Sequence, residues 1–409
     1  MIENTGLQPF VSPKENPLRV AILGSTGSVG AQAIDALSTM GCRIVMLAAG
    51  RDAKTVAEQA RLHKPDICTM DSEAAANDLR LALAGENIRV YGGKDAVCRG
   101  IAECGANLII HSIAGLAGLP SAMAAAESGA RIGMANKEAI IVAGDKIYDA
   151  LKQSGGQLIP VDSEHSAIFQ CLAASGAVQA NGCSGSPIVR RILLTASGGP
   201  FFGMDRDELE KVTPAQALAH PTWKMGPKIT IDCATLMNKG FEVIEAVRLF
   251  GVSVDQIDVL VHRQSIIHSM VEYIDNTVIA QLGAPDMRSC IRYAASYPTR
   301  TWVDGQGLDF AALHSLTFDA PDTNTFPLLA VAREAIRRDG IDPAVLVAAD
   351  EEAVDAFLRG EVSLNALADA VIETVERTAH RAAEDIGDIY EAQRIAREDT
   401  RRILRKYMR

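Results

Sequence analysis

A strand, a glycine-rich turn and a helix open the ordered part of the chain, and this unit restricts the folds open to the rest. Residues 18–37, LRVAILGSTGSVGAQAIDAL, begin with an apolar run, turn through Gly24, Gly27 and Gly30, and continue with alanine-rich helical periodicity. Such glycines let a backbone approach a pyrophosphate, whose charge then lies at the helix N-terminus. The spacing is GxxGxxG rather than GxGxxG, which is weak by itself, but its place between strand and helix predicts a dinucleotide site. The predicted contacts are Gly24, Ser25, Thr26, Gly27, Ser28 and Val29.

Short apolar runs alternate with helical stretches through the first 165 residues. After the first strand they are RIVMLAAG, DICTM, NLIIHSIAG, RIGMANKEA and QLIPVDSE. This alternation is typical of a doubly wound parallel sheet, in which ligands bind beyond the carboxyl ends of the strands. We therefore expect two groups to face the cofactor crevice: Asn136, Lys137 and Glu138 after one strand, and Asp162 and Glu164 after another.

The end of the second strand bears on the choice of nicotinamide cofactor. An NAD site usually places an acidic residue there, whereas an NADP site offers a cation to the extra phosphate. Gly50 and Arg51 come first in this chain, and Asp52 follows. The order favours NADPH, although Arg51 as a solvated surface charge is an equally good interpretation.

The acidic pair in QLIPVDSEHSAI raises the question of a metal. If the strand continues through Asp162 and Glu164, positions i and i+2 point to one face and the two carboxylates crowd together. That crowding is unfavourable unless a positive charge lies between them. His165, beside the pair, is expected to support it rather than to bind a metal.

A later helix offers a third carboxylate. In HPTWKMGPKITIDCATLMNKGFEVIEA, residues 220–246, helical spacing puts Asn238, Glu242 and Glu245 on one face with Lys239 at its margin. Taken alone, this is a surface helix with a Lys239–Glu242 ion pair. Together with Asp162 and Glu164, Glu242 completes an oxygen-ligand set that suits Mg²⁺ or Mn²⁺.

Two further segments predict substrate contacts. In LLTASGGPFFG, Ser197, Gly198 and Gly199 follow an apolar strand, and free N–H groups at such a turn can hold a phosphate; an ordinary turn is equally compatible. HPTWKMG joins His220 and Trp223 and ends at Gly226, a composition suited either to a loop that closes over a site or to a small satellite core.

Composition excludes several classes of function. A net charge of −11 argues against nucleic-acid binding, and the basic tail RRILRKYMR is interpreted as a solvated helix end. The eight cysteines show no CxxC pair and no dense disulfide spacing, which fits a reducing compartment. The first residues, MIENTGLQPFVSPKENP, do not resemble a secretory signal, and no apolar run is long enough to cross a bilayer. We expect a cytoplasmic enzyme with no membrane partner.

Taken together and in order, the motifs resemble one family, the NADPH-dependent 1-deoxy-D-xylulose 5-phosphate reductoisomerases. The resemblance is carried by GSTGSVG, ANKEAI, VDSEHSAIFQ, TASGGPF, HPTWKMGPKITIDCATLMNKGFEVIEA and VHRQSIIHSMVEY, and it spans nearly the whole chain. It implies conversion of 1-deoxy-D-xylulose 5-phosphate, a small phosphorylated sugar, to 2-C-methyl-D-erythritol 4-phosphate for isoprenoids, by a homodimer.

The resemblance also implies residue roles. Metal ligands are Asp162, Glu164 and Glu242; catalytic residues are Lys137, Glu164 and His220. Substrate contacts are Ser163, Glu164, Ser197, His220, Trp223, Cys233, Asn238, Lys239 and Glu242, with Glu245 close by; cofactor contacts include Gly50, Arg51, Asn136, Glu138 and Gly226. Two positions depart from the family pattern. Cys233 replaces the serine of DSAT, which is expected to weaken a hydrogen bond to phosphate, and AADEE around Asp350 replaces AANE, which affects local helix packing.

A chain of 409 residues is too long for one core. We expect an NADPH-binding Rossmann-like domain over 1–161 and a central α+β catalytic and dimerisation domain over 162–297, with mainly antiparallel strands IDVLVHRQS, SMVEYID and TVIAQLG. A linker over 298–322 then leads to a C-terminal helical domain over 323–409, which opens with FPLLAVAREAIRRDG.

Two alternative functions stay open. A metal-independent NADP-dependent dehydrogenase of a small aldehyde or hydroxy acid does not explain the three carboxylates Asp162, Glu164 and Glu242. A nucleotide-sensing regulator would need a DNA-binding or partner-binding module, and the sequence offers no basic helix-turn-helix signal.

Overall fold

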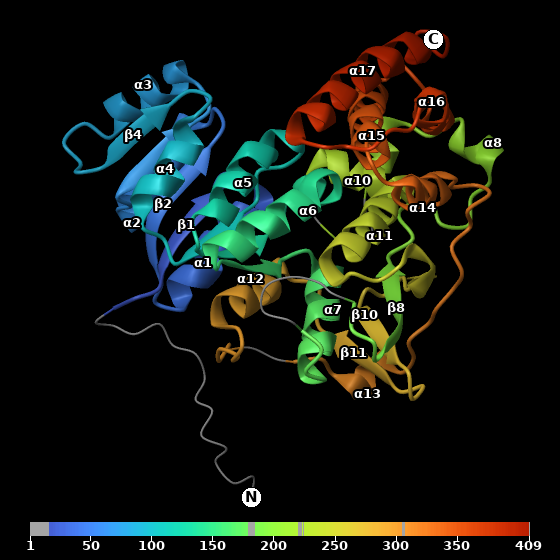
Figure 1. The fold of residues 1–409 in the computed structure, drawn as a ribbon, viewed down its shortest axis with the longest axis horizontal. Coiled ribbons are helices and arrows are strands. Elements are labelled where there is room, and N and C mark those ends of the chain that lie inside the picture. The colour runs from blue at the N-terminus through green and yellow to red at the C-terminus, as the bar shows by residue number, and fades with distance from the viewer. Residues whose placement is uncertain (1–15, 179–184, 220–222, 224, 305–306, 409) are drawn as a thin grey trace, which may run out of the picture.

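The structure is a computed structural model that describes residues 16–178, 185–219, 223, 225–304 and 307–408. A parallel sheet with its helices forms the N-terminal part, and the red helices of the C-terminal part lie on the opposite side of the molecule (Figure 1). A second sheet lies below these C-terminal helices in the same view.

The N-terminal sheet has seven parallel strands in the order β4-β3-β2-β1-β5-β6-β7. Its strands are β1 (Arg19–Leu23), β2 (Arg43–Ala49), β3 (Ile67–Met70), β4 (Arg89–Gly92), β5 (Leu108–His111), β6 (Arg131–Met134) and β7 (Gln157–Pro160). The order reverses at β1, where Val20 pairs with both Ile44 of β2 and Leu108 of β5. The carboxyl ends of β1 and β5 therefore flank the topological switch point at which such sheets bind ligands.

Helices cover both faces of this sheet. They are α1 (Ser28–Thr39), α2 (Ala53–His63), α3 (Glu73–Ala82), α4 (Ala96–Cys104), the 3₁₀ turn η1 (Leu116–Gly118), α5 (Leu119–Glu127) and α6 (Lys137–Ser154). Contacts of α4 with α5 and of α5 with α6 make one layer, and α12 (Met287–Ser296) returns from the later chain to pack beside α1. Both faces are thus buried, and the central strands β1 and β2 are apolar and buried after their first residue, as parallel sheets require.

The second sheet has four strands in the order β11-β10-β8-β9. They are β8 (Val189–Ala196), β9 (Ile257–Val261), β10 (Ile267–Tyr273) and β11 (Val278–Leu282). β10 pairs antiparallel with both neighbours, whereas β8 and β9 are parallel, so the expectation of a mainly antiparallel sheet is confirmed. The helices between β7 and β11 are α7 (Ser163–Ala174), α8 (Arg206–Leu209), α9 (Pro214–Ala217), α10 (Pro227–Ala234), α11 (Met237–Phe250) and the 3₁₀ turn η2 (Val254–Gln256).

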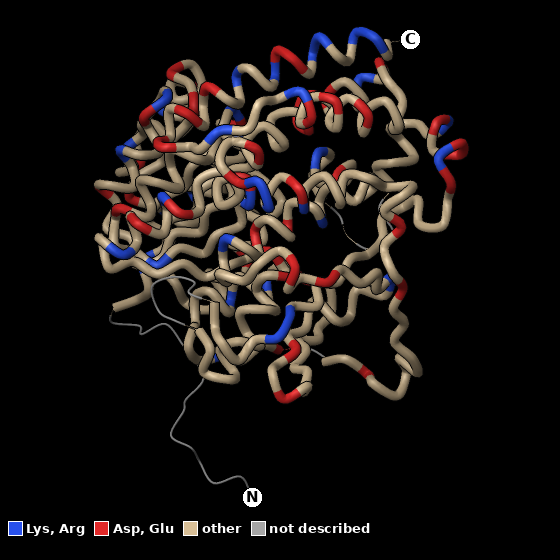
Figure 2. Tube along the Cα trace, turned by 45° about the vertical axis from the view of Figure 1, so that its right-hand side comes forward, with Lys and Arg blue, Asp and Glu red and all other residues tan. Residues whose placement is uncertain are grey.

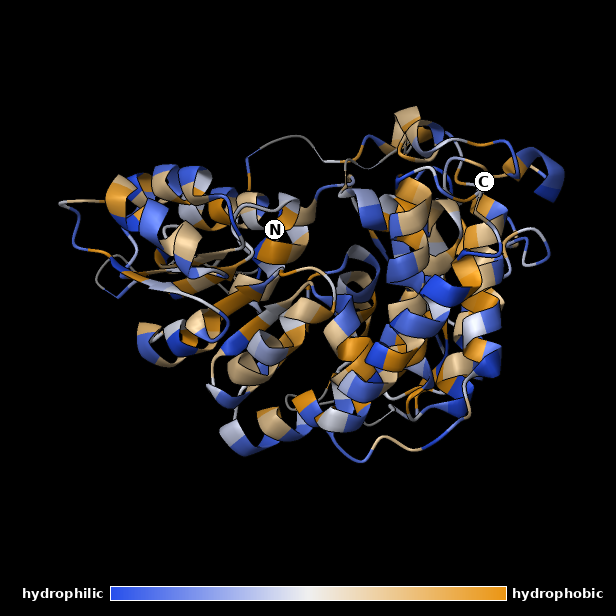
Figure 3. Cartoon of the chain, turned by 90° about the horizontal axis from the view of Figure 1, so that it is seen from above, coloured by the Kyte–Doolittle hydropathy of each residue, from blue (hydrophilic) through white to orange (hydrophobic). Residues whose placement is uncertain are grey.

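Helices make up the C-terminal part. They are α13 (Phe310–Leu313), α14 (Leu328–Arg338), α15 (Asp342–Leu358), α16 (Leu364–Arg377) and α17 (Ile386–Leu404). α15 is almost entirely buried between α16, α17 and α14, whereas α17 carries alternating acidic and basic residues on its outer side (Figure 2). Bands of hydrophilic and hydrophobic residues run along the helices, which is the pattern of helices packed on one face (Figure 3). Within the described residues, no helix is both long and apolar enough to span a bilayer.

The predicted fold class is confirmed, and three local expectations are corrected. β4 was not predicted; it is a short edge strand whose residues are exposed or half-buried, so its apolar signal is weak. β6 ends at Met134, and Lys137 and Glu138 already belong to α6. The strand before the acidic pair ends at Pro160, and α7 begins at Ser163, so Asp162 and Glu164 are not alternate residues of an extended strand.

Candidate active site

Three carboxylates meet where α7 and α11 approach each other. Asp162 is the residue just before α7, Glu164 lies in its first turn, and Glu242 lies on α11. One ligand oxygen from each lies within 4.8 Å of the others. The predicted cluster therefore forms, although it is produced by a strand–helix junction and not by strand alternation. Three carboxylate oxygens of this kind fit a hard divalent cation.

Two buried lysines compensate much of this negative charge. Lys137 Nζ lies 2.6 Å from Asp162 Oδ2 and 3.4 Å from Glu242 Oε1. Lys239 Nζ lies 3.0 Å from Glu164 Oε1 and also pairs with Glu242. Although burial opposes ionisation, Lys137 holds the pKa of Asp162 well below its usual range. The Lys239–Glu242 pair expected of a surface helix exists, but it is buried within the site.

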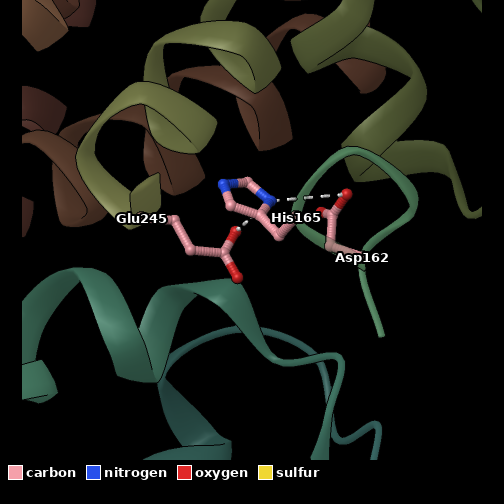
Figure 4. Close-up of side chains that lie close together, drawn as sticks. All are labelled: Asp162, His165 and Glu245. Atoms are coloured by element: carbon pink, nitrogen blue, oxygen red, sulfur yellow. Dashed lines mark ion pairs between the residues drawn. The ribbon is translucent and has the colours of Figure 1, made fainter. Parts of the chain in front are cut away.

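His165 lies between Asp162 and Glu245 and forms an ion pair with each (Figure 4). The imidazole Nδ1 lies 3.4 Å from Glu245 Oε2 and 3.8 Å from Asp162 Oδ1, and Nε2 donates to the carbonyl oxygen of Glu242 at 2.9 Å. Burial opposes protonation of His165, but Glu245 and Asp162 raise its pKa to about 9. The histidine therefore contacts Asp162, Glu245 and the backbone of Glu242, and its role beside the predicted metal ligands stays a prediction.

The formal charges of the site leave one carboxylate without a lysine partner. Counted as ionised, the carboxylates of Asp162, Glu164 and Glu242 exceed the two ammonium groups by one negative charge, while burial raises the pKa of Glu242 and raises that of Glu245, which faces His165, to about 8. A divalent cation would leave the site positive, which suits an anionic substrate. The donor set and its charge therefore fit Mg²⁺ or Mn²⁺.

The predicted phosphate turn lies beside this cluster. Gly198 and Gly199 have φ of +77° and +69°, and the Gly199 N–H donates to Ser197 Oγ at 3.3 Å. A β-carbon on Gly199 would lie 2.4 Å from the carbonyl oxygen of Cys233, so the turn packs directly on the end of α10. Only glycine permits both this conformation and this contact.

A strained turn joins α10 to α11 and brings their polar residues together. Leu236 has φ of +59°, a conformation that a β-carbon disfavours. The turn places Asn238 against Lys137, whose Nζ donates to Asn238 Oδ1 at 2.8 Å, while Asn238 Nδ2 donates to Glu242 Oε1 at 2.5 Å. Asn238 and Lys239, predicted at the phosphate end, therefore hold the carboxylates in this structure.

The dinucleotide turn has the geometry that its sequence predicts. A β-carbon on Gly24, whose φ is +87°, would lie 2.6 Å from Ser112 O, and one on Gly30 would lie 2.1 Å from Gly24 O. α1 starts directly after Gly27, so the turn delivers a bound phosphate to the helix N-terminus. Ser25 Oγ is buried and has no hydrogen-bond partner among the described residues, which leaves it available to a ligand. This cradle fits a dinucleotide.

The ribose end of the predicted cofactor site favours a phosphorylated cofactor. Asp52 caps α2, with its carboxylate accepting from the Thr55 N–H at 3.0 Å and from the Thr55 hydroxyl at 2.6 Å. Its oxygens are thus engaged locally, whereas Arg51 is exposed beside Gly50 at the end of β2. The structure removes the main objection to the interpretation of Arg51 as a phosphate contact.

A cavity of about 980 Å³ joins the two halves of the site. Of the predicted residues, its wall contains Gly27, Ser28, Val29, Lys137, Glu138, Asp162, Ser163, Glu164, Ser197, Trp223, Gly226, Cys233, Asn238, Lys239 and Glu242. Gly24, Ser25, Thr26, Gly50, Arg51 and Asn136 do not line it. Asn136 instead caps α6 and donates to the carbonyl oxygens of Ile113 and Gly115, so it positions the loop after β5. His220 lies outside the described residues.

Several cavity residues were not singled out from the sequence. His268 lies on β10 with its ring centroid 6.2 Å from that of Trp223, and burial lowers its pKa. Lys228, Glu351 and Arg397 also line the wall. The motif VHRQSIIHS contains His268, but nothing in its spacing distinguishes a cavity residue from a core residue.

Three family models match most of the chain. Residues 20–144 match the family described as 1-deoxy-D-xylulose 5-phosphate reductoisomerase, residues 158–250 match its C-terminal domain, and residues 282–399 match the DXP reductoisomerase C-terminal domain. The enzyme of that name from Caulobacter vibrioides is 45% identical over 364 residues, 88% of this chain and 89% of that protein. The one from Chloroherpeton thalassium is 43% identical over 373 residues, 91% of this chain and 94% of that protein.

Solved structures agree as well. The reductoisomerase from Zymomonas mobilis in complex with NADPH is 37% identical, with a TM-score of 0.86 over 95% of this chain and 99% of that one. A DOX-P reductoisomerase in complex with NADPH, fosmidomycin and magnesium is 32% identical, with a TM-score of 0.86 over 95% of this chain and 98% of that one. The family matches, the identity and the shared fold lead to one conclusion: this chain belongs to the 1-deoxy-D-xylulose 5-phosphate reductoisomerase family.

Proposed function

We propose that this protein converts 1-deoxy-D-xylulose 5-phosphate to 2-C-methyl-D-erythritol 4-phosphate, an isoprenoid precursor, with NADPH and Mg²⁺ or Mn²⁺. The observation that carries the proposal is a single cavity whose wall holds both the dinucleotide turn at Gly27 and the carboxylates of Asp162, Glu164 and Glu242. A reaction that combines a rearrangement with a reduction needs both sets of groups around one substrate. Relatives solved with NADPH, magnesium and fosmidomycin support the choice of ligands.

A divalent cation and NADPH would supply the chemistry that side chains lack. A divalent cation would polarise the substrate ketone and stabilise negative charge on oxygen as the carbon–carbon bond breaks, and NADPH would reduce the rearranged aldehyde. The protein's part is to hold the cation with Asp162, Glu164 and Glu242, and to keep the substrate fragments together. The half-buried Trp223, which lines the cavity, would exclude water.

We assign catalytic roles to Lys137, Glu164 and His220. Burial lowers the pKa of Lys137, but the carboxylates of Asp162 and Glu242 raise it well above its usual value. This lysine therefore stays charged and donates hydrogen bonds. Its ammonium already contacts Asn238 and Asp162. A substrate oxygen bound to the cation would lie close to these same side chains. The role of His220 rests on the resemblance of its motif.

The phosphate end of the substrate is assigned to Ser197, Cys233, Asn238 and Lys239, with Ser163 and Trp223 contacting the rest of the molecule. The cofactor is assigned to the turn at residues 24–29, to Gly50 and Arg51, and to Glu138 and Gly226. Asn136 acts there by holding the loop after β5.

A homodimer and a cytoplasmic location are further proposals. β11 is an edge strand with half-buried residues and an exposed Val278, and the nearby Ile274 is 63% exposed. A second copy would cover this edge. The seven cysteines that the structure describes are free, which fits a reducing compartment. We also propose domain borders at residues 161, 297 and 322, which limited proteolysis would test.

The decisive experiment follows NADPH absorbance after addition of 1-deoxy-D-xylulose 5-phosphate, with Mg²⁺, with Mn²⁺ and with excess chelator. We expect oxidation that requires the metal and a product identified by mass spectrometry as 2-C-methyl-D-erythritol 4-phosphate. Oxidation that persists with the chelator would support a metal-independent dehydrogenase, and an absence of oxidation under all conditions would contradict the proposal.

A further inference from the structure

Two consecutive residues of the C-terminal helix α15 contact two different walls of the cavity. Asp350 contacts α10, which forms part of the substrate wall, and Glu351 contacts the loop at residues 112–115, which forms part of the cofactor wall. We propose that Asp350 and Glu351 are positioning residues that fix these walls relative to each other. The inference rests on the proposed function, because that function decides which ligand each wall binds.

Asp350 holds α10 through Lys228. The Asp350 side chain is fully buried, and its Oδ2 lies 2.8 Å from Lys228 Nζ. The same ammonium lies 2.6 Å from Asp232 Oδ2 and 4.5 Å from the ring centroid of Phe241. Since two buried carboxylates and an aromatic ring surround one ammonium, Lys228 has little freedom, and α10 is tied to both α15 and α11.

The position of α10 determines that of the phosphate turn. The carbonyl oxygen of Cys233, in the last turn of α10, packs against the α-carbon side of Gly199 so closely that a β-carbon there would lie 2.4 Å away. A displacement of α10 must therefore displace the turn at Ser197–Gly199 or open a gap beside it. Asp350 thus acts on the phosphate end without touching a ligand.

Glu351 holds the cofactor loop by packing. Gly115 has φ of +68°, and a β-carbon there would lie 2.8 Å from Glu351 Oε1. The other carboxylate oxygen pairs with Arg397 of α17, whose guanidinium also lies 3.1 Å from Glu352 Oε1. The loop is held from its own domain by Asn136 and from the C-terminal helices by Glu351.

This arrangement predicts separable effects on the two ligands. Loss of the Asp350 side chain should affect the sugar phosphate, because it releases α10, and loss of the Glu351 side chain should affect NADPH, because it releases the loop at 112–115. The isosteric amides keep the shape of both side chains and should preserve more of the effect than the alanines do. A role limited to stability would instead change both ligands together with the melting temperature.

The test compares Asp350→Ala and Glu351→Ala with Asp350→Asn and Glu351→Gln in the full-length protein. The dissociation constant of NADPH is measured by fluorescence titration without substrate, and kcat and KM for 1-deoxy-D-xylulose 5-phosphate are measured by NADPH oxidation. We expect Asp350→Ala to raise this KM about fivefold with little change in NADPH affinity, and Glu351→Ala to weaken NADPH binding about fivefold, magnitudes typical of indirect coupling. The two amide variants should recover to within about twofold of the parent.

Glu361→Ala is the matched control, because Glu361 lies just beyond the end of α15, pairs with Arg359, and does not line the cavity. It should leave both constants unchanged. The proposal is overturned if the alanine variants at 350 and 351 behave like this control, or if both constants shift in parallel with the melting temperature. Failure of the parent protein to oxidise NADPH would instead contradict the proposed function, and the NADPH titrations would still test Glu351.

Discussion

Glu242 is the residue on which the cluster depends most directly. Its two carboxylate oxygens face Lys137, Lys239 and Asn238, and it is 1% exposed. Glu242→Gln keeps the shape but removes the charge that a cation requires, so we expect turnover to fall at least about a hundredfold. NADPH affinity should change less than about twofold, because the dinucleotide turn is untouched. Kinetic assays measure turnover, and fluorescence titration measures NADPH affinity. Glu103→Gln, at an exposed position, is the control. Retained turnover in Glu242→Gln would remove Glu242 from the metal site.

Cys233 offers a second residue-level prediction. It lines the cavity beside the phosphate turn, and burial raises the pKa of its thiol, so it stays neutral and donates only weakly. Cys233→Ser introduces a stronger donor of similar size. We expect KM for the sugar phosphate to stay equal or to fall, measured from initial rates at saturating NADPH. A clear rise in KM would mean that the thiol is better accommodated than a hydroxyl.

Residue types predicted the cluster of three carboxylates better than the backbone reasoning did. Asp162, Glu164 and Glu242 come together as their oxygen chemistry suggested, but the strand argument for Asp162 and Glu164 was wrong, because the strand ends at Pro160. The contacts of Asp350 with Lys228 and of Glu351 with Gly115 could not be predicted. They join segments more than 100 residues apart, and local sequence carries no signal for such pairings.

At the level of elements, the close approach of α1 to the turn that follows β1 depends on Gly30. A β-carbon there would lie 2.1 Å from Gly24 O and 2.8 Å from Ser25 Cα, both backbone atoms that cannot rotate away. We expect Gly30→Ala to destabilise the protein by about 1–3 kcal/mol and to weaken NADPH binding, because the turn must open. Urea unfolding and fluorescence titration measure the two effects.

Gly307→Ala provides the comparison for that substitution. Among the residues that the structure describes, no other group lies within 4 Å of the position of its β-carbon, so the free energy of unfolding should change by less than about 0.5 kcal/mol. Equal effects at both positions would contradict the close approach of α1.

Hydrophobic periodicity predicted the order of the helices and strands, but it did not predict the residues at which they begin and end. Alternation of apolar strands with helices predicted the parallel sheet, and the long amphipathic helices after residue 327 were also expected. β4 was not predicted, because an edge strand needs few buried residues and so gives a weak apolar signal. The early start of α6 at Lys137 depends on capping by Asn136, whose side chain accepts from the Ala139 N–H at 2.7 Å, and the sequence ANKEA supports strand and helix alike.

At the scale of the whole molecule, the cluster joins two parts of the chain through charge. α7 supplies Asp162 and Glu164 directly after the parallel sheet, and α11, against which α14 packs, supplies Glu242. Counted as ionised, their three carboxylates exceed the two lysines by one negative charge, and burial together with repulsion from Glu164 raises the pKa of Glu242. A bound divalent cation would remove that repulsion and tie the parts together.

Added Mg²⁺ or Mn²⁺ should therefore stabilise the folded protein in the absence of substrate and NADPH. A cation that binds only the native state contributes about 2.7 kcal/mol at a concentration 100 times its Kd, and the gain should reverse with chelator. Asp162→Asn and Glu242→Gln should lose most of this gain, because each removes one ligand charge, whereas Glu103→Gln on the distant α4 should keep it. Thermal unfolding at several metal concentrations checks the expectation. Equal metal stabilisation in the two ligand variants and in the parent would place the stabilising cation elsewhere, and the charge imbalance at α7 and α11 would then need another counterion.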